Sequence, residues 1–496
     1  MRRACWAAAI AVLLSLAPVT FQSIKSESRG LVEHPSGGDV QARTQGISDV
    51  PVWRVNDNWV YDGYLDVADF AADSGVSTNV ETLNGSLSRT VQDIYISNVD
   101  ENETLVYEVQ SVGSYQSDGS IDLDGNSGCL YVDMETTEVI RTSDLATFSQ
   151  QVSIDVYFDP WCWSALRQTV GVLSVLNTFT PPLENYDFPI SVGESWEMSY
   201  QQETEYDGES NFGIEIPDDT NESNSTSWTV VNQGNSGVSF PGCYQSFNVT
   251  SYDSNGDESG FNWYCPHVKG EVRSSIVQAF GFVAVHNLVT YQPVQGGKEI
   301  TIDVQYPISP TGIETLAWIN ATEQGQAISD LDIQFRYESE TLVRNVSTDA
   351  NGTIQLEFNS GSNPDDSIGE GELGSHGLVA WIESEGIIGA STLIIDSDVH
   401  QIDLVSRSSG VSVQRFRPST GNEVSLDPSM GFSAVRGDVM TFSLQVMNRG
   451  LNPSPETTIV VDAPDGSEVT GHVPQLASLQ ESRVEVNWTV PENHPF

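Results

Sequence analysis

The sequence predicts an all-β protein in which two tandem antiparallel curved-sheet modules are followed by two β-sandwiches. From residue 77 onward, apolar and polar residues alternate in segments rich in β-branched and aromatic side chains, as in half-buried strands. Clusters of Asp, Asn, Gly and Ser separate these segments and suit hairpin turns. A short pattern around a tryptophan also occurs twice, which indicates a duplicated unit in the first part of the chain.

The repeated pattern lies at 52–61, which reads VWRVNDNWVY, and at 191–200, which reads SVGESWEMSY. In both segments a valine precedes a turn-prone residue and an acid, and a tryptophan follows (Trp59 and Trp196). Recurrence of such a unit is the sign of an internal repeat.

A second pair of landmarks follows each tryptophan at a similar distance: LYVDMETTEVIR at 130–141 and WYCPHVKGEVRS at 263–274. In each we expect a tyrosine to end a strand and a turn to lead into a returning strand that begins with Glu-Val. The sequence therefore predicts two copies of one sheet module, at 48–180 and 184–296.

One segment predicts a helix instead. In 164–177, Leu166, Val170 and Leu173 recur at the spacings of three and four residues that place side chains on one helix face. The prolines at 181 and 182 would end such a helix.

The paired Trp-led pattern with its later Tyr and Glu-Val hairpin resembles the half-barrel sheets of exported proteins of the lipoprotein-carrier type. This resemblance implies that each module is a curved sheet whose concave face either binds an apolar molecule or is plugged by a helix such as 164–177. Trp59 and Trp196 are then the candidate ligand-binding residues.

The passage 300–405 has short strands at regular spacing, which predicts a β-sandwich. Its segment VSTDANGTIQLEF resembles the turn and strand of immunoglobulin-like or transthyretin-like surface modules.

The last part, 408–496, resembles the CARDB (cell-adhesion-related) domain of microbial surface proteins. The resemblance lies in Arg436-Gly437-Asp438 before a strand, Asn448-Arg449-Gly450 after it, and Leu479-Gln480-Glu481 before the strand 483–490. It implies an immunoglobulin-like sandwich, and because the family continues with further strands, this one is expected to be truncated. We interpret Arg436-Gly437-Asp438 as a tight turn before a strand and not as an adhesion tripeptide.

Charge restricts the partners of the chain. Its 496 residues carry 69 Asp and Glu against 20 Lys and Arg, a formal charge of −49. Nucleic acid and anionic membrane surfaces would repel such a protein. Lysine occurs only at 25, 269 and 298, and this scarcity beside abundant carboxylates is typical of a hydrated surface in salty water, which predicts a marine or halophilic source.

The first residues predict export. Arg2 and Arg3 precede an apolar run, so 1–23 has the layout of a signal peptide, with an uncleaved membrane anchor as the alternative. We expect a secreted or cell-surface location.

Export favours disulfides, and removal of Cys5 with the signal leaves four cysteines for which three pairings exist. Cys243 and Cys265 flank one predicted hairpin loop and are expected to pair, which leaves Cys129 with Cys162.

The sequence gives no catalytic pattern, and we predict that the protein is not an enzyme. Many serine hydrolases carry their nucleophile on a Gly-x-Ser-x-Gly turn, and no such turn occurs. A zinc site requires ligands at short spacing, whereas the histidines stand far apart. We expect no cofactor except a possible Ca²⁺, because Asp253, Asn255 and Asp257 alternate in one loop as Ca²⁺ ligands do. A plain hairpin tip is the alternative.

We therefore predict a non-catalytic secreted or cell-surface protein that serves adhesion, binding or scaffolding. Its partner would be a surface protein, a glycan or an apolar ligand. A carrier of a lipid or other apolar molecule in the half-barrels is the first alternative, and an accessory part of a secreted hydrolase is the second.

Overall fold

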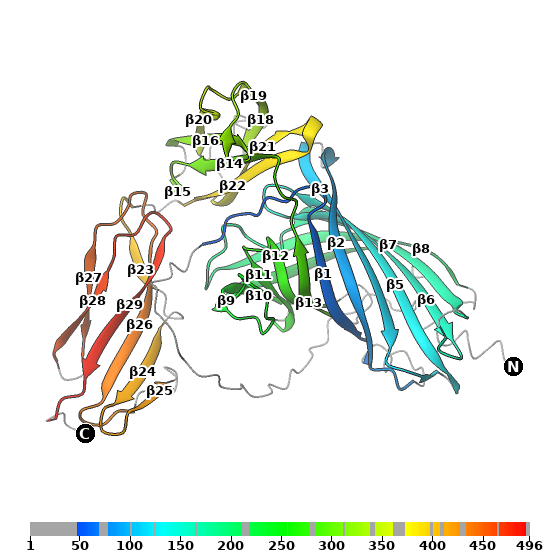
Figure 1. Cartoon of the computed structure of the whole chain (residues 1–496), viewed down its shortest axis with the longest axis horizontal. Helices are drawn as coiled ribbons and strands as arrows, with labels where there is room; N and C mark the ends of the chain where they lie inside the picture. The colour runs from blue at the N-terminus through cyan, green and yellow to red at the C-terminus, as the bar shows by residue number, and fades with distance from the viewer. Residues whose placement is uncertain are drawn as a thin grey trace.

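A computed structural model describes residues 47–492, apart from 69–77, 100–101, 124, 164–165, 211–217, 255, 278–282, 311–312, 338–342, 361–372, 397–399, 407–410, 427–432 and 464–465. The predicted signal peptide lies outside the described residues. The described chain is all-β, with curved sheets that include a closed barrel of 12 strands, and one 3₁₀ turn at Glu383–Glu385. Three bodies are visible in Figure 1: the barrel, a first sandwich over one end of it, and a second sandwich.

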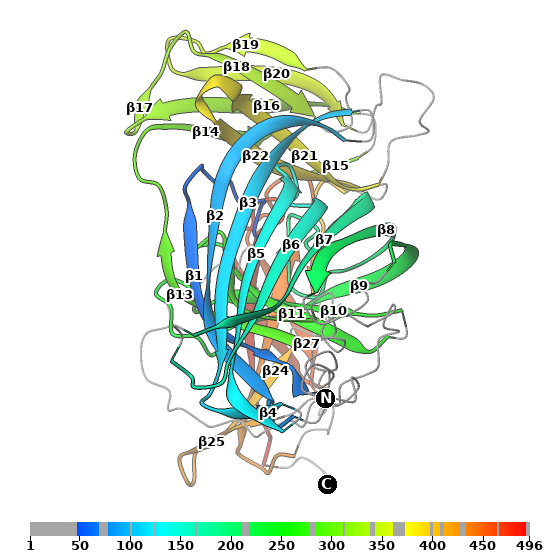
Figure 2. The same ribbon diagram turned by 90° about the vertical axis from the view of Figure 1, so that its right-hand side faces the viewer.

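The barrel occupies most of the first 292 residues, and all its neighbouring strands are antiparallel. Its strands are β1 (Asn58–Asp66), β2 (Thr82–Val99), β3 (Asn102–Ser117), β4 (Ile121–Leu123), β5 (Asn126–Arg141), β6 (Thr147–Asp159), β7 (Gln168–Leu183), β8 (Ser195–Ser210), β9 (Thr220–Gly234), β10 (Ser246–Tyr252), β11 (Glu258–Cys265), β12 (Gly270–Val277) and β13 (Val283–Gln292). Pairing of β3 with β5 closes the ring, and β4 only extends the edge of β5. Figure 2 shows the long strands β2, β3, β5, β6 and β7 curving side by side.

The prediction of two separate half-barrel sheets was wrong. The strands of 48–180 and those of 184–296 form two arcs of one unbroken ring, because β7 pairs with β8 and β1 pairs with β13. The physical reason is that each six-stranded half alone would expose two unpaired edges. When the halves join at both edges, the backbone groups of every edge strand are paired, which only closure of the sheet achieves.

The two Trp-led turns nevertheless have the same local structure. Asn56 and Gly193 both have positive φ, of 75° and 81°. In each turn the following acid, Asp57 or Glu194, accepts a hydrogen bond from the backbone N–H three residues earlier, at 3.0 and 2.9 Å. The second landmarks do not match in this way, since 263–274 contains the predicted turn whereas 130–141 lies within the single strand β5.

The predicted helix at 164–177 is also wrong, because residues 168–183 form β7. Val170 and Leu173 both face the core, although alternation alone would place them on opposite faces. The register between β6 and β7 shifts at Val156/Tyr157, opposite this segment, so a bulge supplies the extra residue. A bulged strand therefore produced a spacing of three that resembles a helix face.

Two apolar clusters fill the barrel, one at each end. We call the end where β1 begins the junction end and the end where β1 finishes the far end. The junction-end cluster is rich in aromatic side chains, including Trp53, Trp59, Tyr107 and Phe188. The far-end cluster is mainly aliphatic and comes largely from β5, β6 and β7.

The first sandwich packs on the junction end. Its two sheets are formed by β14 (Lys298–Val304), β15 (Ile308–Ser309), β16 (Ile313–Glu323), β17 (Gln326–Ala327), β18 (Asp332–Tyr337), β19 (Arg344–Ser347), β20 (Thr353–Ser360), β21 (Gly374–Ile382) and β22 (Ile387–Ile395). Both sheets contribute to one core. Val379, Trp381 and Ile388 of this sandwich belong to the barrel's junction-end cluster, and the Thr392 amide donates to the Asp49 carboxylate at 2.9 Å. The barrel and the first sandwich thus share a core.

The second sandwich is made of β23 (Leu404–Ser406), β24 (Ser412–Arg417), β25 (Asn422–Leu426), β26 (Val439–Asn448), β27 (Thr457–Asp462), β28 (Glu468–Val473) and β29 (Glu481–Thr489). In it, Asp438 is buried and its carboxylate accepts two hydrogen bonds from Arg417 at 3.0 Å. Asp438 also accepts the Val435 N–H, so the carboxylate of Arg436-Gly437-Asp438 is used inside a turn before β26.

Candidate functional site

The two predicted ligand-binding tryptophans belong to the packed core of the junction end. Trp59 is 2% exposed and its indole N–H donates to the Val268 carbonyl at 2.7 Å. Trp196 is half-buried, donates to the Glu184 carbonyl at 3.3 Å and stacks on Trp228. The structure brings both into one cluster, where each indole already has its polar partner.

The barrel interior also holds a network of charged groups that sequence reasoning did not identify. The Arg89 guanidinium lies 3.1 Å from Glu138 and 3.4 Å from Glu271, and the Tyr186 hydroxyl donates to Glu271 at 2.8 Å. Burial opposes the charge of Arg89, but the two carboxylates outweigh it and raise the Arg89 pKa above its ordinary value. The sequence did contain a signal for this network, because Glu138 and Glu271 are the glutamates of the two Glu-Val landmarks.

A second buried pair lies between the two apolar clusters. The Tyr115 hydroxyl and His286 Nε2 are 2.7 Å apart, and burial lowers the pKa of His286 to about 4. This histidine is therefore neutral at pH 7 and contacts a neutral tyrosine. The groups of the Arg89 network and of this pair thus each have a polar partner inside the barrel.

The predicted Ca²⁺ loop forms a hairpin tip between β10 and β11. One oxygen of Asp253 accepts the Asp257 N–H at 2.9 Å, as a carboxylate does in a turn. Asn255 lies outside the described residues. Among the residues that the structure describes, no group of three His, Cys, Asp or Glu is placed to hold a metal ion. Ca²⁺ binding stays a prediction.

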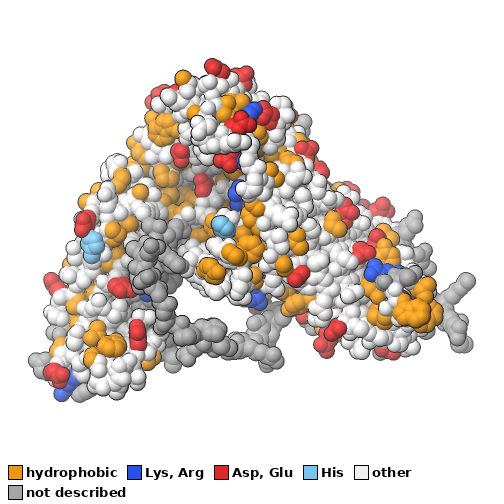
Figure 3. Space-filling model, in the orientation of Figure 1, with side chains coloured by type: hydrophobic (Ala, Val, Ile, Leu, Met, Phe, Trp, Pro, Cys, Tyr) orange, Lys and Arg blue, Asp and Glu red, His pale blue; other side chains and the backbone are white. Residues whose placement is uncertain are grey.

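Among the described residues, the most exposed tryptophans lie at the far end of the barrel, in the connection from β6 to β7. The exposed fractions are 60% for Trp161, 71% for Trp163 and 45% for Leu166. We call these three residues the tip patch. In the space-filling view, hydrophobic side chains gather at this end of the barrel (Figure 3). The opposite end of the barrel is instead covered by the first sandwich (Figure 1).

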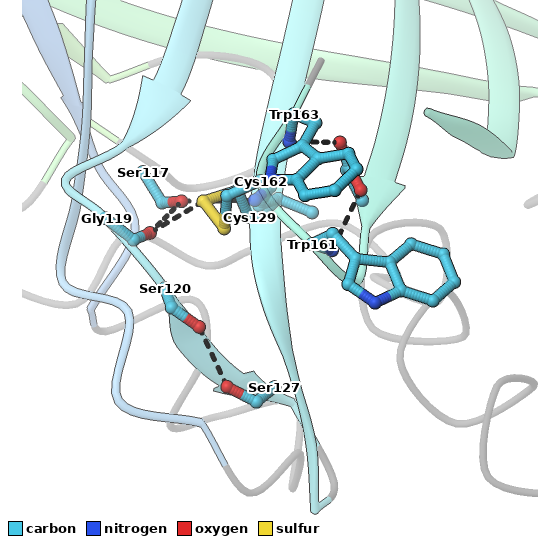
Figure 4. Close-up of a disulfide and its surroundings, with 10 residues drawn as sticks. Ser117, Gly119, Ser120, Ser127, Cys129, Trp161, Cys162 and Trp163 are labelled. Atoms are coloured by element: carbon cyan, nitrogen blue, oxygen red, sulfur yellow. Dashed lines mark hydrogen bonds between the residues drawn. A yellow bond between two sulfur atoms is a disulfide. The ribbon is translucent and has the colours of Figure 1, made fainter. Parts of the chain in front are cut away.

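The tip patch is held by a buried carboxylate. Asp159, the last residue of β6, is 0% exposed, and its two oxygens accept the backbone N–H groups of Trp161 and Trp163 at 2.9 and 2.7 Å. These bonds fix the backbone of both tryptophans. Because both amides are used in this way, the chain turns sharply and the indoles project outward (Figure 4).

A disulfide anchors the same connection to the neighbouring strand. Cys162 stands between the two tryptophans, has a positive φ of 56°, and is bonded to Cys129 of β5 (Figure 4). Beside it, Arg167 lies 3.8 Å above the Tyr131 ring. The second disulfide, Cys243–Cys265, lies at the junction end, so both bonds follow the predicted pairing. Disulfides indicate an oxidising compartment.

The sequence signal for the tip patch was the run DPWCWSAL, in which two tryptophans flank a cysteine. This signal was not recognised because the residues after the run have helical spacing, and a helix here would be expected to bury its apolar side chains in the core.

No protein-family model matches the chain, and a comparison with curated proteins finds no match. Within the described residues, no helix is long and apolar enough to cross a membrane.

Proposed function

We propose that this is an exported, non-catalytic binding protein that docks onto a protein partner through the tip patch. The observation that carries the proposal is the pair of outward-facing indoles of Trp161 and Trp163 on a connection closed by a disulfide. The two sandwiches, which we take to be immunoglobulin-like and, at 408–496, CARDB-like, would act as spacers that present the barrel at a cell surface.

The exposure of the indoles supports a docking role because large apolar side chains grouped on a surface mark interaction sites. Tryptophan is also the residue type that most often anchors protein interfaces. Asp159 and the Cys129–Cys162 bond fix the connection before any partner arrives. This preorganisation lowers the entropy cost of binding.

The charge of the chain specifies the surface of the partner. With a net charge of −49, approach to an acidic protein would be repelled, whereas a basic surface would be steered toward it. Indole rings also attract cationic side chains at their faces. We therefore expect the partner to offer an apolar pocket with Arg or Lys at its rim.

The carrier alternative has less support. It requires an open apolar cavity beside Trp59 and Trp196, and these side chains instead pack in the junction-end core with their N–H groups bonded.

A photo-cross-linking amino acid at position 163 of the full chain, mixed with surface proteins of the source cells, tests the proposal. The matched control carries the same probe at Val460, an apolar residue of the second sandwich that is 55% exposed. We expect one protein to cross-link only from position 163, and binding of that purified protein to weaken at least tenfold in Trp161→Ser/Trp163→Ser but not in Val460→Ser.

The same cross-linked products from both positions would contradict the proposal. So would a self-dimer that the double variant abolishes, because the tip patch would then pair two copies of this chain.

A further inference from the structure

Nine short motifs in the chain have the form that N-linked glycosylation requires. Each consists of an asparagine, any residue except proline, and a serine or threonine, and in an exported protein such a motif can accept a glycan. The asparagines are Asn84, Asn102, Asn221, Asn224, Asn248, Asn320, Asn345, Asn351 and Asn487, and the side chain of Asn102 lies outside the described residues. Because so short a motif often stays unmodified, the accessibility of each asparagine in the fold has to decide among them.

Two of the motifs present both of their essential side chains to solvent. On a strand, residues two positions apart lie on the same face, so the asparagine and the hydroxyl of one motif emerge together. The exposed pairs are Asn84 with Ser86 on β2 and Asn221 with Ser223 on β9. Within the residues that the structure describes, none of these four side chains forms a hydrogen bond. The amide and the hydroxyl of each motif are therefore accessible to an enzyme.

The motifs of the two sandwiches already use their polar groups in hydrogen bonds. The side-chain nitrogens of Asn320 and Asn351 donate to carboxylates at 3.3 and 3.4 Å. The Asn487 amide oxygen accepts a threonine hydroxyl at 2.7 Å, and the serine of the Asn345 motif donates to a carboxylate. In the barrel, Asn248 has a buried side-chain oxygen. These five asparagines are less available for modification.

Two consecutive motifs on β9 face opposite ways. They form the run NESNST at 221–226. Asn221 is exposed, whereas Asn224, three residues later, lies on the face of the strand that carries the core residue Trp228. The Asn224 side-chain nitrogen donates to the Gln202 side chain at 3.2 Å. The chain therefore contains its own comparison between an accessible motif and an engaged one.

We propose that Asn84 and Asn221 carry N-linked glycans and that Asn224 does not. In the reaction, the asparagine side-chain nitrogen forms a bond to the anomeric carbon of a sugar that is carried on a lipid phosphate. The bond from that carbon to the phosphate oxygen breaks, the lipid phosphate leaves, and the nitrogen loses one proton. The exporting cell supplies the transferase and the lipid-linked sugar. The proposal rests on the export included in the proposed function and is independent of the tip patch.

Mass spectrometry of the full chain purified from the culture medium of its source cells tests the proposal. Fragmentation by electron transfer keeps a glycan on its residue and so separates Asn221 from Asn224. We expect sugar mass on Asn84 and on Asn221 in at least half of the molecules, and unmodified asparagine at position 224.

Variants expressed in the same cells identify the motif. Asn221→Gln and Ser223→Ala should each lower the intact mass by one glycan, because the first removes the acceptor nitrogen and the second removes the hydroxyl that the transferase requires. Asn224→Gln is the matched control and should leave the number of glycans unchanged.

A secreted chain that carries no sugar on Asn84 and Asn221 would overturn the proposal and leave the docking role standing. A glycan on Asn224 would also overturn it, because accessibility in the fold would then not select the modified residue. A chain that is retained inside the cell and carries no sugar would contradict both this proposal and the proposed export.

Discussion

The two ends of the barrel use tryptophan in opposite ways. At the junction end, Trp53 and Trp59 are buried with their N–H groups bonded to the carbonyls of Lys269 and Val268, and their rings pack edge to face. At the far end, the backbone N–H groups of Trp161 and Trp163 are bonded, whereas their indoles are exposed and have no bond within the described residues. The first pair therefore stabilises the fold, and the second is available to a partner.

The difference comes from what covers each end. The first sandwich lies over the junction end, where Trp53 and Trp59 are only 4% and 2% exposed. At the far end the disulfide and the Asp159 carboxylate order the connection but do not cover its indoles. A residue that binds a partner requires a fixed backbone and an exposed side chain.

Truncation of one tryptophan from each end should show the largest contrast. We expect Trp59→Ala to lower the free energy of unfolding by about 3–5 kcal/mol, because it leaves a cavity in the aromatic core and an unpaired Val268 carbonyl. Trp163→Ser should change it by less than about 0.5 kcal/mol. Urea unfolding measures both. Similar losses in the two variants would show that the far-end indoles also support the fold.

The next effect concerns the charged network beside the aromatic side chains of the junction-end cluster. Arg89→Met leaves Glu138 and Glu271 together in the barrel interior without their cation, and we expect a loss of about 3 kcal/mol in urea unfolding. Arg89→Met/Glu138→Gln/Glu271→Gln should recover most of it, because neutral amides need no counter-ion. If the triple variant were as unstable as the single one, packing of the arginine side chain would matter more than its charge.

The last effect is a pair of opposed pH dependences. Burial, helped by Asp144, raises the pKa of Asp187 at the junction end to about 6, against 3.8 for the ordinary side chain. Its ionised form therefore costs stability above pH 6, and this cost disappears as the pH falls toward 4. His286 has the opposite sign, because its folded pKa is about 4 against 6.5, so its stabilising contribution is present above pH 6.5 and is lost toward pH 4.

We therefore expect Asp187→Asn to be more stable than the wild type at pH 7 and to lose that advantage near pH 4. His286→Gln should instead lose less stability than the wild type as the pH falls from 7 to 4. Urea unfolding at pH 4, 5, 6 and 7 checks both slopes. The same slope in wild type and both variants would exclude these two groups as its source.

Local pattern predicted much of the fold and little of the site. Alternation of apolar and polar residues correctly predicted an all-β chain, because side chains on a strand alternate between faces. The turns at Asn56 and Gly193 have the same local structure, as the repeated pattern indicated, because turn geometry depends on a few adjacent residues. The strand β7 was missed because its bulge moves Val170 and Leu173 to one face. The sequence pattern did not single out Trp161 and Trp163, because the residues that follow them had the spacing of a helix. It did not single out Arg89, because Glu138 and Glu271 are distant from it in the sequence.

The sequence by itself determined that this protein is an acidic β-chain with a recurring Trp-led turn, since composition and neighbouring residues decide such features. Only the tertiary structure decided that the two predicted sheets join in one ring, and which tryptophans are core and which are exposed. Closure depends on pairing β1 with β13 and β3 with β5. Burial depends on which surface comes to lie over a side chain, and no local pattern of residues contains that information.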